Sequence, residues 1–351
     1  MACTTTPSNK SITGIICIIK LENQKLEKIF VCEFITGGGL CAELLPESLV
    51  NEGAMMRDAL LRDLSVLNYS VSTSVDARLI SPKHCAECVE VQADDDVWQV
   101  WQDQIKAADA VWLIAPETDG LLHYLTQIAT QEGKLVLGCG PASIKITSEK
   151  MATCLALEEA GIATIPTYTF ENWPRSHWIW LAKPNDGAGC SDTAWFNNAD
   201  DLQDWIEQND KQLTHVIQAY QPGDSASISC VMKVGKAHLL SCNTQMIEII
   251  NHMVSYKGSV INGMREHWAQ FEVVANRIAK AFPDLAGYVG IDVIVDNDDI
   301  YVVEINPRLT TSYVGLREAT GVNPAELIIN TLTQPNFEWP VLQQNKVKIH
   351  V

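Results

Sequence analysis

Residues 288–309 read YVGIDVIVDNDDIYVVEINPRL, and this stretch decides the fold. Two apolar runs flank the acidic turn DNDD, which predicts an antiparallel hairpin. Asp292 lies on the first predicted strand, and Glu304 and Asn306 lie two residues apart on the second, where alternate side chains share a face. Carboxylate and amide oxygens that converge across neighbouring strands are typical ligands of a hard cation such as Mg²⁺.

The surroundings of these charges support that interpretation. The alternative is that Asp292 and Glu304 lie on the solvated face of an edge hairpin. Their apolar neighbours disfavour this alternative, because an unpaired carboxylate among such side chains is expensive. Arg308 follows two residues beyond Asn306, and its planar charged group could hold a phosphoryl group or a carboxylate in the same region.

Two lysines earlier in the sequence are candidates for binding an anion near the hairpin. Lys183 ends an apolar strand in LAKPNDGAGCSDT (residues 181–193), and the loop of Gly187, Ala188 and Gly189 exposes backbone N–H groups. An ordinary turn is an equal alternative for this loop taken alone. Lys150 stands at the start of a predicted helix, where a positive charge opposes the helix dipole unless a phosphate lies nearby. A surface lysine is the alternative.

A further connector lies in VIQAYQPGDSASIS, residues 216–229. A strand there runs into a Pro-Gly turn, and Asp224 follows it. Extended backbone of this kind can bind an adenine edge, while the carboxylate accepts hydrogen bonds from ribose hydroxyls. A plain turn between two sheet strands is the alternative, and the sequence alone does not separate the two.

The alternation of elements predicts the organisation of the chain. Strand-like runs, the first at residues 11–20, alternate with helical patterns up to about residue 140, which indicates a parallel sheet with helices on its faces. A helix capped by Ser148 and a later helix capped by Asn323 are also expected. We expect an N-terminal α/β domain over 1–140, a central segment over 141–225 and a C-terminal segment over 226–351.

The net charge, the apolar runs and the cysteine spacing exclude several classes of function. The 351 residues include 43 acidic and 25 basic side chains, a net charge of −18, which argues against binding to nucleic acid or anionic membranes. No apolar run reaches the roughly 20 residues that a membrane helix needs, and no signal peptide is recognisable, so a cytoplasmic location is expected. Cys85 and Cys88 have the spacing of half a zinc site beside His84, but an ordinary loop is favoured because no second half is found.

In this order, the helix-start lysine in SEK, the strand-end lysine in AKP, the PGD hinge, GID and VEINPR resemble the ATP-grasp superfamily. The resemblance implies an α/β (α+β) fold with a Rossmann-like preATP-grasp domain, a small central domain and a C-terminal mixed sheet. It implies that two Mg²⁺ ions, or Mn²⁺, are held by Asp292, Glu304 and Asn306, and that Arg308 steadies an acyl phosphate. Arg308 and Asn306 would then be the catalytic residues. The implied ATP-binding residues are Lys150, Lys183, Gly187, Ala188, Gly189, Gln218, Ala219, Gln221 and Asp224.

The hinge departs from the superfamily pattern. Many members carry an acidic residue where this chain has QAY at residues 218–220. Gln218 still offers an amide oxygen to the adenine amino group, so we expect a changed contact and retained ATP binding.

Motifs outside this core, among them FITGGGL, DAR and EINPRLTTSYVGLREATG, resemble the tyramine-glutamate ligase-like branch, which is linked to methanofuran-type cofactors. The resemblance implies an ADP-forming ligase that joins a carboxylate, such as glutamate, to an amine through an acyl phosphate. The alternatives are a carbamoyl-phosphate-synthase-like enzyme that forms carboxyphosphate, and a non-catalytic ATP-binding regulatory protein. The partners would be small molecules, with a homodimer left open.

The three glycines of FITGGGL first suggest a phosphate cradle. In the related D-alanine ligases the glycine turn after the first strand faces the acceptor substrate, with an acidic residue just beyond it. By that resemblance, Gly38, Gly39, Glu43 and Glu47 would bind the amino substrate. Lys257, in SYKGSVING at residues 255–263, is a further substrate candidate, although a surface loop is favoured there.

Overall fold

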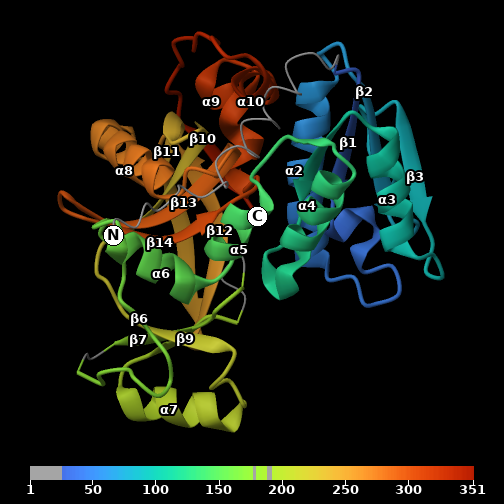
Figure 1. Ribbon diagram of the computed structural model, residues 1–351. Coiled ribbons are helices and arrows are strands. Elements are labelled where there is room, and N and C mark those ends of the chain that lie inside the picture. Colours follow the sequence, from blue (N-terminus) through green and yellow to red (C-terminus); the bar gives the residue numbers. More distant parts are fainter. Residues whose placement is uncertain (1–25, 177–178, 188–191) are drawn as a thin grey trace, which may run out of the picture.

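The computed structural model describes residues 26–176, 179–187 and 192–351 (Figure 1). The described part of the chain forms two β-sheets with helices packed against them, which confirms the α/β class expected from the sequence. The strand expected at residues 11–20 lies outside the described residues. In the described ranges, no helix combines the length and the apolar character that crossing a membrane requires.

The first sheet is parallel and has the order β3-β2-β1-β4-β5. Its central strand β1 is buried on both faces, because alternate side chains point to opposite sides. Ile29 and Val31 pack in the same cluster as Leu60 of α2. Phe30 packs on the other face in the cluster of Trp101 from α3. The elements are β1 (Lys28–Glu33), η1 (Ile35–Gly39), α2 (Glu47–Leu64), β2 (Ser70–Asp76), β3 (Glu87–Val91), α3 (Val97–Ala107), β4 (Ala110–Ile114), η2 (Thr118–Gly120), α4 (Leu121–Gln131) and β5 (Leu135–Val136).

The strand order of this sheet reverses between β1 and β4. The chain adds β2 and β3 on one side of β1 and then crosses to the other side for β4 and β5. In open α/β sheets, ligands bind outside the carboxyl ends of the two strands that flank such a reversal. The ends of β1 and β4 are therefore where a site is expected.

The second sheet is largely antiparallel and runs in the order β14-β13-β10-β11-β12-β8-β7-β9-β6, with β15 paired to β12. Helix α8 covers one face of its large half (Figure 1). The strands are β6 (Thr167–Tyr168), β7 (Trp180–Pro184), β8 (Ala194–Phe196), β9 (His215–Ala219), β10 (Asp224–Lys233), β11 (Lys236–Ile250), β12 (Met253–Ile261), β13 (Gly287–Asp296), β14 (Asp299–Asn306) and β15 (Val347–His350). The helices are α5 (Pro141–Thr147), α6 (Lys150–Glu159), α7 (Ala199–Gln208), η3 (Arg265–His267), α8 (Trp268–Ala281), η4 (Thr311–Gly315), α9 (Leu316–Thr320) and α10 (Pro324–Thr333).

Strands β6 to β9 and helix α7 form a small unit, residues 167–219, at the end of this sheet (Figure 1). It has its own core, in which Trp180 and Ile217 pack against Leu202 and Ile206 of α7. The small unit joins the large half of the sheet where Ala194 of β8 pairs with Met253 of β12. The small unit is thus joined to the rest of the sheet over a short length of strand.

The predicted hairpin at residues 288–309 is confirmed by β13 and β14, which pair antiparallel around a turn at Asn297 (φ 55°). Asp292 pairs directly with Glu304 in the register. The alternate residues Ile291 and Val293 are buried in the cluster that contains the core side chains of α8. The two carboxylates therefore lie on the sheet face that points away from α8.

Three local expectations have different outcomes. Residues 255–263, interpreted as a loop, are mostly the strand β12, because they pair with both β11 and β15. Ser148 does not cap α6, since its hydroxyl donates to the carbonyl of Ile144 and the helix begins at Lys150 after Glu149. Asn323 caps α10 as predicted, accepting from the N–H groups of Ala325 and Glu326.

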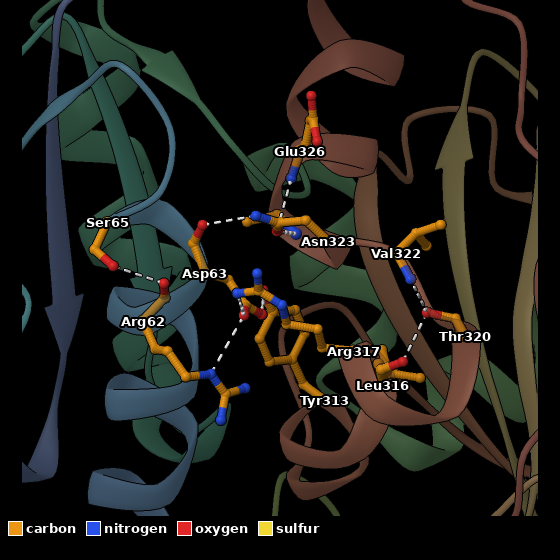
Figure 2. A network of polar contacts seen from close by, with 11 residues as sticks. Arg62, Asp63, Ser65, Tyr313, Leu316, Arg317, Thr320, Val322, Asn323 and Glu326 are labelled. Atoms are coloured by element: carbon orange, nitrogen blue, oxygen red, sulfur yellow. Dashed lines mark hydrogen bonds and ion pairs between the residues drawn. The ribbon is translucent and has the colours of Figure 1, made fainter.

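A buried carboxylate fastens α2 of the first sheet to the helices that follow β14 (Figure 2). The side chain of Asp63 is fully buried and accepts hydrogen bonds from the Tyr313 hydroxyl at 3.1 Å and from Arg317 Nη1 at 3.0 Å. Asn323 Nδ2 donates to the Asp63 backbone carbonyl at 2.8 Å. Burial raises the pKa of Asp63, and Arg62, Arg317 and Tyr313 oppose that rise.

This network predicts an ordered series of stabilities. Asp63→Ala should lower the free energy of unfolding by about 3 kcal/mol, because it leaves Tyr313 and Arg317 without their buried acceptor. Asp63→Asn should cost less, since the amide still accepts a hydrogen bond and no charge is buried. Urea unfolding measures both, with Glu159→Ala as the control, an exposed acid at the end of α6. An Asp63→Ala midpoint equal to the wild-type value would contradict the network's role.

Candidate functional site

The carboxylates of the hairpin meet as the sequence predicted. Asn306 Nδ2 donates to Asp292 Oδ2 at 3.2 Å, and Gln245 Nε2 of β11 donates to Asp292 Oδ1 at 2.8 Å. Glu304 lies beside them on β14 as the register partner of Asp292. Gln245 was not identified from the sequence, because a strand glutamine carries no motif. The result is a compact set of oxygen donors on one face of the sheet.

The two carboxylates have opposite pKa shifts. Burial raises the pKa of Asp292, and the neighbouring charge of Glu304 raises it further. Burial alone would raise the pKa of Glu304, but the charges of Lys150 and Lys183 and the hydrogen bonds with Asp292 and Lys150 together outweigh burial and lower that pKa. The pKa values of the two carboxylates are thus pushed apart, as expected for two neighbouring acids of which only one is paired with a cation.

Lys150 bridges this centre and the glycine loop. Its Nζ lies 3.4 Å from Glu304 Oε2 and donates to the carbonyl of Gly187 at 2.7 Å. The side chain is buried, at 9% exposure, although it is the first residue of α6. Asn185 accepts from the N–H groups of Lys150 and Met151 at this helix start. Lys150, which the sequence singled out by its opposition to the helix dipole, is therefore buried against the carboxylate pair and is not a surface lysine.

The glycine loop also touches the first sheet. Asp186 Oδ2 accepts from the Asp119 N–H at 3.0 Å, and the Thr118 hydroxyl donates to the Asp186 carbonyl at 3.4 Å. Thr118 and Asp119 lie in η2, directly after β4. Ala188 and Gly189, the remaining residues predicted for the loop, lie outside the described residues.

Arg308 crosses from the end of β14 to the end of β4. Its Nε and Nη2 both donate to Glu117 Oε2, at 3.0 and 2.8 Å, and its Nη1 donates to the carbonyl of Leu309. Glu117 is only 5% exposed, and its Oε1 has no hydrogen-bond partner. Sequence reasoning missed Glu117. The available signal was an acid just beyond a buried strand, at the carboxyl edge of a parallel sheet.

The residues predicted for a nucleotide base lie along β9 and the connector to β10. Gln218 is buried, and its Nε2 donates to the Thr167 hydroxyl at 2.8 Å. Its Oε1 is buried without a partner, so it can accept a hydrogen bond from a ligand. Ala219 follows on β9, Gln221 contacts Asp296, and Asp224 begins β10 as an exposed residue.

The glycine turn is built for packing. Its first N–H groups, those of Ile35 and Thr36, donate to the buried carboxylate of Glu33, so they are not free for a phosphate. A Cβ atom at Gly37 would lie 2.8 Å from the Ser74 hydroxyl, one at Gly38 would lie 2.7 Å from the Val91 side chain, and one at Gly39 would lie 2.5 Å from the Phe34 ring. The three consecutive glycines are thus explained by close contacts.

The other residues predicted for the amino substrate lie at the surface. Glu43 and Glu47 are exposed. The backbone that leads to Glu43 is held by Arg78, which donates to the carbonyls of Leu40 and Glu43. Lys257 is an exposed residue of β12 whose ammonium lies 3.7 Å from Glu248.

The Cys-x-x-Cys pair does not gather other ligands. Cys85 and Cys88 are both free thiols in the structure. Within the described ranges, no group of three or more His, Cys, Asp or Glu side chains is arranged to hold a metal. A cation at the hairpin would accordingly be held by two carboxylates and an amide, and water or substrate phosphates would complete its coordination, as is usual for Mg²⁺.

Comparison with known proteins places this geometry in a family. Residues 147–312 match the ATP-grasp domain, and residues 69–144 match the pre ATP-grasp 3 domain. A tyramine–L-glutamate ligase of Methanocaldococcus jannaschii is 28% identical over 92% of this chain and 97% of its own length. A tyramine–L-glutamate ligase of Methanocaldococcus fervens is 31% identical over 84% of this chain and 92% of its own.

A solved structure shares the fold. The biotin carboxylase domain of the Hydrogenobacter thermophilus 2-oxoglutarate carboxylase, in complex with MgADP, ADP and bicarbonate, superposes with a TM-score of 0.71 at 13% identity, covering 92% of this chain and 73% of that one. The chain therefore belongs to the ATP-grasp family of ATP-dependent ligases, in its tyramine–L-glutamate ligase-like branch.

Proposed function

We propose that this protein is an ADP-forming carboxylate–amine ligase that joins L-glutamate to an amine such as tyramine. The observation that carries the proposal is the cluster of Asp292, Glu304 and Lys150, with Arg308 acting on Glu304 from just beyond the end of the same strand. It is supported by the alignment with two tyramine–L-glutamate ligases over most of the chain. A role in the biosynthesis of methanofuran-type cofactors would follow from that product.

The donors at the site fit ATP and two divalent cations. Asp292, Glu304 and Asn306 provide the hard oxygen donors that Mg²⁺ or Mn²⁺ takes, and the like-charge pair gains from a countercation. The buried, unpartnered Oε1 of Gln218 suits the amino group of an adenine. When bound, the cations would neutralise the phosphate charge that builds up during transfer.

The residues of the chain act by positioning and by charge. Lys150 and Lys183 would hold the phosphates, and Arg308 would hold the substrate carboxylate and the phosphoryl group it receives. A carboxylate oxygen attacks the γ-phosphorus and ADP leaves, which forms an acyl phosphate. The uncharged amine nitrogen then attacks the acyl carbon, the bond from that carbon to the phosphate oxygen breaks, and inorganic phosphate leaves with the proton that the nitrogen loses. No nucleophilic side chain is needed for either step.

The first test is turnover. With ATP, Mg²⁺ and L-glutamate, we expect ADP to accumulate when tyramine or another primary amine of a panel is added, and the product mass to equal glutamate plus amine minus water. Bicarbonate in place of glutamate tests the carboxyphosphate-forming alternative. ATP binding without turnover under every condition would overturn the ligase proposal in favour of a regulatory protein.

A second prediction concerns the proton on the carboxylate pair. Because the pKa of Asp292 is raised, the cation-free site keeps a proton to higher pH than an ordinary aspartate does. Mg²⁺ must displace that proton, so its binding should release up to about one proton and its affinity should rise with pH. Calorimetry at one pH in two buffers of different ionisation enthalpy measures the release. Asp292→Asn should abolish it, and equal heats for the wild type would contradict the prediction.

A third prediction concerns Lys150. Lys150→Met should raise the KM for ATP about 10- to 100-fold, the effect of losing one charge-assisted hydrogen bond. The KM for the amine should stay within about twofold, which initial rates at varied substrate will show. Lys145→Met, an exposed lysine on the preceding helix, serves as the matched control. An unchanged KM for ATP would remove Lys150 from the phosphate site.

A further inference from the structure

Where the strand order of the first sheet reverses, the chain places acidic side chains that have no role in the proposed ATP site. Glu33 ends β1, and Glu117 follows β4 by three residues, so both lie at the carboxyl ends of the two strands that flank the reversal. Glu33 is satisfied by the glycine turn, through Ile35 and Thr36. Glu117 is half satisfied, because only its Oε2 accepts from Arg308.

A third acid approaches the same place from α2. A Cβ atom at Gly53, the residue after Glu52 on α2, would lie 2.6 Å from Glu33 Oε2, so this turn of α2 lies against the end of β1. The charges of Glu52 and Arg308 act on each other at this place. Glu52 also acts on Tyr256 of β12, whose hydroxyl lies 2.9 Å from the Thr311 hydroxyl. Within the described ranges, Glu52 makes no hydrogen bond or ion pair. It is half-buried, unlike the exposed Glu43 and Glu47.

The region around Glu52, Glu117 and Arg308 has more carboxylates than cations. Among the described residues, Arg57 of α2 acts on Glu33, and Arg308 acts on Glu52 while its Nε and Nη2 donate to Glu117. One buried carboxylate oxygen and one half-buried carboxylate therefore lack partners, and such groups are costly unless a cation pairs with them. A protonated amine supplies both the positive charge and three hydrogen-bond donors. The carboxylates of Glu52 and Glu117 would repel a ligand that carries its own carboxylate beside the amine.

We propose that Glu52, together with the free Oε1 of Glu117, binds the ammonium group of the acceptor amine, and that Tyr256 and Thr311 line the same subsite. The ammonium then gives one proton to the Glu52 carboxylate, which leaves the uncharged nitrogen that attacks the acyl phosphate. The inference rests on the proposed ligase function and names the residues that select its second substrate. It assigns the acceptor to primary amines that carry no carboxylate next to the amino group, and it places recognition on α2 rather than on the glycine turn.

Two nucleophiles test the subsite. Hydroxylamine is largely uncharged at neutral pH and traps the acyl phosphate as a hydroxamate, so it needs no ammonium subsite. The best primary amine of the panel above is used beside it. Glu52→Gln should raise the KM for that amine about 10- to 100-fold, while the hydroxamate rate and the KM for ATP stay within about twofold. Asp58→Asn makes the same charge change on an exposed part of α2 and should alter neither reaction.

The outcomes separate the two proposals. An unchanged amine KM in Glu52→Gln, or an equal loss of hydroxamate and amide, would overturn the assignment of Glu52 while leaving the ligase intact. A wild-type protein that makes no hydroxamate from ATP and glutamate would instead overturn the ligase proposal. Glu52→Asp keeps the charge but shortens its reach and should give an intermediate KM. Thermal unfolding of each variant, compared with the wild type, shows that the fold is retained.

Discussion

The ion pair between Arg308 and Glu117 is the interaction on which the site depends. A buried guanidinium is stable only when paired, and here the partner comes from the first sheet while the arginine comes from the second. The pair therefore fixes the end of β14 against the end of β4. Glu304 and Asn306 lie on the same strand just before Arg308, so their place relative to the first sheet is set by the same contact.

Around that pair, charge is divided between two sides. On the side that we propose for the nucleotide, the Glu304 carboxylate already has a cation within the protein, because Lys150 faces it and also binds the carbonyl of Gly187. The side formed by α2 and the end of β4 retains unpaired acceptors at Glu52 and Glu117. A ligase needs such an asymmetry, since its two substrates differ in charge: a polyanion on one side and, by our proposal, an ammonium ion on the other.

The parts of this site that could be predicted from the sequence are those that break a local rule. Asp292 and Glu304 stood among apolar residues, and Lys150 stood at the wrong end of a helix dipole. Glu117 and Gln245 broke no rule, because an acid after a strand and a glutamine within one are ordinary, and only the strand order brings them to the site. Glu52 is likewise one acid among several on a helix. The hairpin and its flanking elements were predictable because their patterns are local, whereas the pairing of β12 with β15, which turns a presumed loop into a strand, joins residues far apart in the chain.

Helix α2 has a mechanical consequence of its own. Glu52 lies near its start and the buried Asp63 network lies near its end, about 16 Å away at 1.5 Å per residue. The end of α2 is thus fixed by the polar network of Asp63 with Tyr313 and Arg317. Lys150 and Glu304 lie on other elements, so by our proposal a substitution in that network would shift the amine subsite and leave the phosphate site in place.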